Sequence, residues 1–66
     1  MNVYKIDTVS KSDYLYCLRV IDSLDLERIS AYSDDWHCEF EITFESDAIP
    51  HPIMELGDRI NVRKIK

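Results

Sequence analysis

Glycine, proline and cysteine are scarce in this 66-residue chain, which has one glycine, two prolines and two cysteines. A single glycine excludes the glycine-rich loops that cradle phosphate groups, and it leaves most turns to Asp and Asn. Cys17 and Cys38 are too few for the disulfide framework of a small secreted domain. We therefore expect two free thiols and a reducing, cytoplasmic compartment.

Long apolar runs are also missing. None approaches the ~20 residues that a membrane-spanning helix requires. The first residues, Met1–Asp7, carry charges where a signal peptide would have an apolar region. Both observations predict a protein with no membrane partner and no exported form.

Basic residues are the scarcer charge. Acidic residues outnumber them 13 to 8, for a net charge of −5. Nucleic-acid phosphates and anionic membranes repel such a chain unless its few basic residues cluster. A basic protein surface is the more natural charged partner.

The segment Trp36–Glu45 has the clearest pattern in the chain. Apolar and polar residues alternate along it, which is typical of a strand with one dry face and one wet face. The predicted dry face comprises Trp36, Cys38, Phe40, Ile42 and Phe44. The wet face is acidic because glutamate recurs on it. The alternation itself predicts a small β-rich domain.

The rest of the chain supplies further expected strands at Asn2–Val9, Tyr14–Ile21 and Arg59–Ile65. Seven of the eight residues in Tyr14–Ile21 are apolar, which is typical of a central strand covered on both sides. For Asp22–Tyr32 we favour a strand and leave a helix as the alternative. We expect a hairpin of about Leu26–Tyr32 with Trp36–Glu45. Prolines 50 and 52 predict an extended, irregular run around His51.

These elements predict one all-β domain over residues 1–66, with room for one short helix. Its four or five antiparallel strands would form a small barrel-like sheet. From Trp36 to the C-terminus, a strand, a loop, the Gly57-Asp58 turn and a final basic strand resemble the second half of oligonucleotide-binding (OB) and SH3-like barrels. The resemblance concerns architecture only and implies no functional residue.

No arrangement of residues indicates catalysis or a cofactor. Cys17, His37, Cys38 and His51 are zinc-ligand types, but they lack the paired spacing of structural zinc sites. His37 and Cys38 would point to opposite faces of a strand, so they cannot act together as base and nucleophile. We expect no enzyme, no metal and no cofactor.

The acidic wet face is the strongest functional candidate. Regularly spaced carboxylates can imitate a phosphate backbone and occupy a nucleic-acid-binding surface on another protein. Tyr and Trp near the hairpin turn would serve as interface anchors. The predicted partner-binding residues are Tyr32, Asp34, Asp35, Trp36, Glu39, Glu41 and Glu45. This predicts a small acidic regulator or inhibitor, by analogy with short phage and mobile-element proteins, that docks on a larger basic partner.

Three other interpretations stay open at the sequence level. The glutamates are also what a solvated strand face or a protected sheet edge requires. A barrel could bind single-stranded nucleic acid through its C-terminal basic residues, Arg59, Arg63, Lys64 and Lys66. The protein could also be a subunit of a larger assembly, such as a homodimer, built by pairing of an exposed strand.

Overall fold

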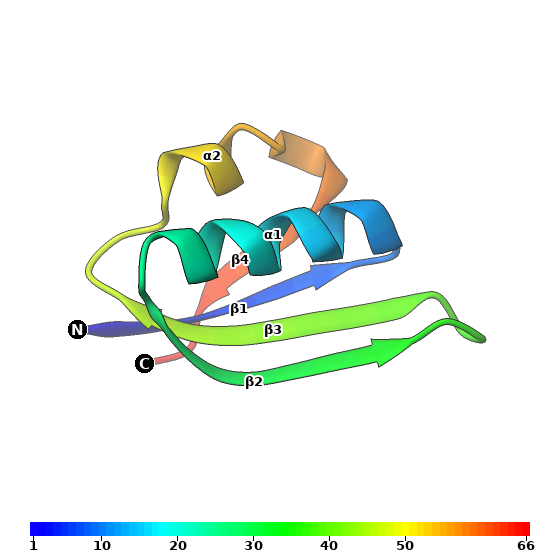
Figure 1. The fold of residues 1–66 in the computed structure, drawn as a ribbon, viewed down its shortest axis with the longest axis horizontal. Helices are drawn as coiled ribbons and strands as arrows, with labels where there is room; N and C mark the ends of the chain where they lie inside the picture. Colours follow the sequence, from blue (N-terminus) through cyan, green and yellow to red (C-terminus); the bar gives the residue numbers. More distant parts are fainter.

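A computed structural model describes all 66 residues as one antiparallel sheet with its helices on one side (Figure 1). The strands are β1 (Asn2–Thr8), β2 (Glu27–Asp34), β3 (Glu39–Ser46) and β4 (Asn61–Lys64). They lie in the order β2-β3-β1-β4, and every neighbouring pair is antiparallel. The predicted class, a small domain of four antiparallel strands with a short helix, is confirmed. The sheet is open, with β2 and β4 at its edges, and closure into a barrel is not confirmed.

The main difference from the sequence prediction is α1 (Lys11–Ser23), which replaces the strand expected over Tyr14–Ile21. Ser10 begins the helix, because its Oγ accepts a hydrogen bond from the backbone N–H of Asp13 at 3.3 Å. Ser10–Asp13 are therefore the N-cap and first turn of α1. The buried positions Tyr14, Cys17, Val20 and Ile21 recur at helical spacing, while Leu15 and Tyr16 are partly exposed.

The helix ends without a glycine. Asp25 adopts the left-handed conformation (φ 57°), which Asp and Asn tolerate better than most residues. The backbone N–H of Leu26 then donates to the carbonyl of Ile21 at 3.1 Å, as in the usual closing turn of a helix. This turn leads directly into β2, so the predicted strand over Asp22–Tyr32 is right only for its second half.

The hydrophobic core lies between α1 and the sheet. Alternate residues of β1 and β3 point into it, with Ile6, Ile42 and Phe44 fully buried. The dry face predicted for the Trp36–Glu45 strand is confirmed for Phe40, Ile42 and Phe44. Ten buried apolar residues make up this core: Tyr4, Ile6, Tyr14, Cys17, Val20, Ile21, Phe40, Ile42, Phe44 and Ile53.

Trp36 and Cys38 were assigned wrongly to the dry face. Both lie in the turn before β3, and Trp36 is 88% exposed. The strand starts three residues later than predicted because the Asp34 carboxylate accepts hydrogen bonds from the backbone N–H groups of Trp36 and His37. Such side-chain bonds bend the chain into a turn.

The last third of the chain covers one end of the core. After Pro50, the short helix α2 (His51–Met54) inserts Ile53 into the core. The extended run predicted around His51 therefore ends at Pro50, because His51 and Pro52 belong to the helix. A 3-10 turn, η1 (Gly57–Arg59), follows and begins with Gly57 at φ 58°. β4 is therefore shorter than the Arg59–Ile65 strand predicted. No helix in the structure has the length and apolarity needed to cross a membrane.

Candidate functional site

The face of the sheet opposite α1 carries no covering element (Figure 1). Cross-strand partners share a face, so the strand register defines this surface, which we call the open face. Its carboxylates come from three strands: Asp7, Glu27, Asp34, Glu39, Glu41 and Glu45. Its cations are Lys5 and Arg63. The open face is therefore strongly acidic.

Each of the two cations pairs with one carboxylate, Lys5 with Glu41 on β3 and Arg63 with Asp7 on β1. Lys5 Nζ lies 3.0 Å from Glu41 Oε1, and an Arg63 guanidinium nitrogen lies 3.5 Å from Asp7 Oδ2. The carboxylates of Glu39 and Glu45 form no ion pair. The uncompensated negative charge is thus concentrated on β2 and β3.

Tyr32 lies within this charged region. It stands opposite Glu41 in the register, and its hydroxyl donates a hydrogen bond to Asp34 Oδ2 at 3.3 Å. The nearby charge of Asp34 raises the pKa of the Tyr32 phenol, and Glu39 and Glu41 add to the increase. The phenol therefore stays neutral, and its aromatic ring, about half exposed, lies among carboxylates.

Asp34 also organises the turn between β2 and β3, which we call the hairpin tip (Asp35–Cys38). Its Oδ1 accepts from the backbone N–H of Trp36 at 3.1 Å and of His37 at 3.2 Å. Its Oδ2 lies 2.7 Å from His37 Nδ1. The hydrogen bonds from His37 hold the pKa of Asp34 below its ordinary value. This carboxylate therefore holds the chain in the form that exposes Trp36.

The structure brings together most of the residues predicted for partner binding. Tyr32, Asp34, Glu39 and Glu41 lie on the open face at the end next to the hairpin tip. Trp36 and Asp35 belong to the tip itself, where Asp35 pairs with Lys11 at 3.2 Å. Glu45 lies at the other end of β3, opposite Glu27, and stands apart from the group.

Sequence reasoning missed four contributors to this surface: Lys5, Asp7, Glu27 and His37. Alternation in the first strand, which places Ile6 inward, already puts Lys5 and Asp7 on the opposite face. The sequence alone does not show that Glu27 lies on the open face, because that depends on the register of β2 with β3. The contact of His37 with Asp34 had no signal, because it depends on the shape of the turn.

The C-terminal cations proposed for nucleic-acid binding are largely paired. Arg59 contacts the buried Asp13, and Arg63 contacts Asp7. Lys64 and Lys66 are exposed and form no ion pair. Two free lysines make a weak electrostatic footprint for a phosphate backbone.

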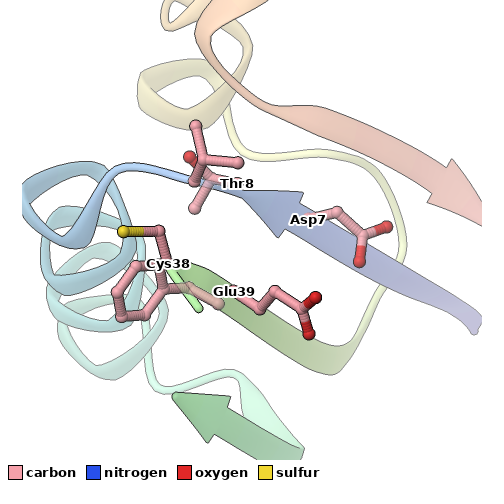
Figure 2. A pocket seen from close by; sticks show the side chains of 6 residues that line it. Asp7, Thr8, Cys38 and Glu39 are labelled. Carbon is pink, nitrogen blue, oxygen red and sulfur yellow. The ribbon is translucent and has the colours of Figure 1, made fainter. Parts of the chain in front are cut away.

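A pocket of about 210 Å³ lies beside the start of β3. Its lining comprises Asp7, Thr8, Val9, Cys38, Glu39 and Phe40. Figure 2 shows the carboxylates of Asp7 and Glu39 on one side and the Cys38 sulfur on the other. These groups do not converge on a point where a ligand atom could react.

The cysteines and histidines are dispersed. No three His, Cys, Asp or Glu side chains gather as metal ligands would. Both cysteines are free: Cys38 is exposed at the hairpin tip, and Cys17 is buried in the core. Burial, with a smaller effect of Asp13, raises the pKa of the Cys17 thiol to about 11, so this thiol stays protonated at neutral pH.

Comparisons of the chain with protein-family models, with curated proteins and with solved structures give no match.

Proposed function

We propose that this protein is a small acidic protein-binding module that acts as a regulator or inhibitor. Its open face and hairpin tip dock on a larger basic partner, whose own surface binds nucleic acid. The observation that carries the proposal is the acidic group Asp34, Glu39 and Glu41 at the end of the open face beside the 88% exposed Trp36. Of these three carboxylates, Glu39 forms no ion pair.

The physical argument combines two kinds of contact. Acidic side chains on a rigid sheet steer a basic partner and set the orientation of docking. Exposed Trp and Tyr supply the buried aromatic anchors that dominate binding energy at interfaces. Trp36 and Tyr32 stand next to the carboxylates, so lysine or arginine side chains of the partner can contact both an aromatic ring and a carboxylate.

The partner is expected to use a nucleic-acid-binding surface, because a row of carboxylates competes with phosphates for the same cations. Short acidic proteins of phages and mobile elements offer an analogy for an inhibitor that docks on a nucleic-acid-binding protein. The pairing of Arg59 and Arg63 with carboxylates weighs against direct nucleic-acid binding by this chain.

The test is a pull-down with tagged protein from nuclease-treated bacterial lysate at low and moderate salt. We expect one stoichiometric partner, which Glu39→Lys with Glu41→Lys releases. The matched control is Asp22→Lys with Glu55→Lys, which makes the same change in charge at two exposed positions, one in α1 and one directly after α2. Loss of the partner in both variants, its retention by the Glu39→Lys/Glu41→Lys variant, or its capture only from lysate without nuclease would contradict the proposal.

A further inference from the structure

The outer edge of β2 is open for pairing with another strand. β2 is an edge strand, and its residues from Glu27 to Ser33 are all exposed. Edge strands present unpaired backbone N–H and C=O groups, and proteins usually protect them with lysine, proline or charges that point inward. A β-bulge, which is another such protection, lies between Arg28 and Ser30. Beyond it, Ser30–Ser33 reads Ser-Ala-Tyr-Ser and has no lysine, proline or charge.

We propose that β2 accepts an extended segment of the partner as a fifth strand, and that this segment has Lys or Arg at alternate positions. The proposal rests on the proposed function and names its mode of binding. It belongs to the known class of recognition in which backbone hydrogen bonds supply affinity and alternate side chains supply specificity.

The charge around β2 selects a basic segment. Alternate residues of a fifth strand would stand on the open face, directly beside Ser30, Tyr32 and Asp34. Neighbouring strands are about 4.8 Å apart, so a long cationic side chain reaches over β2 toward Glu39. The β2 residue opposite Glu39 is Asp34, so such a side chain meets both carboxylates.

The other side chains of the guest segment would face the helix side of the sheet. There β2 presents Ala31 and Ser33, and the half-exposed Ile29 lies nearby. These positions favour small or apolar side chains over charged ones. The expected guest therefore alternates a basic residue with an apolar residue.

The same charges argue against a second copy of this chain as the guest. Two β2 strands paired about a twofold axis near Ala31 would bring Asp34 of one copy toward Glu27 of the other. Both residues lie on the open face, where like charges on adjacent strands are destabilising. Each copy also carries a net charge of −5.

The experiment titrates the intact protein with three synthetic peptides and follows backbone amides by NMR and hydrogen exchange. The probe is (Lys-Val)4. The first control, (Lys-Pro)4, keeps the charge but removes half of the N–H donors and disfavours strand pairing. The second control, (Glu-Val)4, keeps the strand propensity and reverses the charge.

We expect (Lys-Val)4 alone to slow exchange of alternate β2 amides, those not bonded to β3, by roughly tenfold or more. The Glu39→Lys/Glu41→Lys variant should lose this protection. Equal binding of (Lys-Pro)4 without protection of β2 would overturn strand addition and leave the acidic docking face intact. Equal binding of (Glu-Val)4 would overturn the selection of a basic guest. If neither lysine peptide binds at low salt, both this inference and the electrostatic basis of the proposed function are wrong.

Discussion

Arg59 holds the buried carboxylate of Asp13 although 46 positions separate them in the chain. Arg59 Nε donates to Asp13 Oδ2 at 3.2 Å, and a second guanidinium nitrogen contacts Oδ1. Asp13 is only 4% exposed. The backbone carbonyl of Arg59 also accepts a hydrogen bond from Thr8 Oγ1 at 3.2 Å. This pair therefore joins the start of α1 to the η1 turn and fixes the segment that closes the core.

Removing the arginine should destabilise the fold. Arg59→Ala leaves the Asp13 carboxylate buried without its partner, and we expect a loss of about 2 kcal/mol in the free energy of unfolding, since Arg59 itself is largely exposed. Urea denaturation measures the loss. Arg59→Ala with Asp13→Asn should recover part of it, because the buried charge is gone. Equal stability of Arg59→Ala and the parent would show that Asp13 gains nothing from the pair.

The two faces of β3 should respond differently to small substitutions. Ile42 is fully buried, so Ile42→Val removes one packed methyl group and should cost about 1 kcal/mol. Thr43 is its neighbour on the open face, and Thr43→Val should change stability by less than about 0.5 kcal/mol. Thermal or urea unfolding compares the two. A larger effect at Thr43 than at Ile42 would contradict the assignment of faces.

The two thiols should differ in reactivity. Cys38 is exposed and should react with a thiol reagent in the folded protein, whereas Cys17 should react only after unfolding. Timed labelling followed by mass spectrometry counts the modified thiols. Fast labelling of both cysteines in native buffer would mean that the core opens at α1.

The buried thiol also predicts a loss of stability in alkali. The pKa of Cys17 is about 11 in the folded protein against an ordinary value of 9.0. The folded state favours the protonated thiol. The contribution of Cys17 to the free energy of unfolding is therefore complete below pH 9.0, the pKa of an ordinary thiol, and is lost as the pH rises to about 11, the pKa in the folded protein. Between these two pH values, the free energy of unfolding should fall more steeply with pH for the parent than for Cys17→Ala. Parallel curves would contradict the shift.

Acid should loosen the hairpin tip. The pKa of Asp34 is lowered in the folded state from an ordinary value of 3.8, chiefly by its hydrogen bonds from His37. The ordered tip is therefore favoured above that value and is lost as pH falls through the lowered pKa. Amide exchange of Trp36 and His37 should accelerate in this range, and in Asp34→Asn already at neutral pH. Asp35→Asn, whose parent carboxylate contacts Lys11 instead, is the matched control and should leave these amides unchanged.

The sequence was most informative where a single period ran without interruption. Phe40, Ile42 and Phe44 alternate with polar residues, and that pattern identifies both faces of β3 and the acidic character of the open one. The same alternation in the first strand identifies the inward position of Ile6. Both strands have one covered face, which is the condition under which alternation is strict.

The helix could not be recognised in this way. Leu15 and Tyr16 are partly exposed in the structure, yet they extend the apolar run and make Tyr14–Ile21 resemble a buried strand. The decisive signal was Ser10 followed three residues later by Asp13, a helix start that also suits a polar turn. Trp36 was misplaced for a related reason, because only the hydrogen bonds to Asp34 show that the chain turns there.

The strand order also bears on how the protein forms during synthesis. β1 leaves the ribosome before both of its neighbours in the sheet, β3 and β4. Until they emerge, β1 has no strand to pair with, and α1 has only part of the surface it packs against. The domain is therefore expected to fold in one cooperative step, after β4 has emerged to pair with β1.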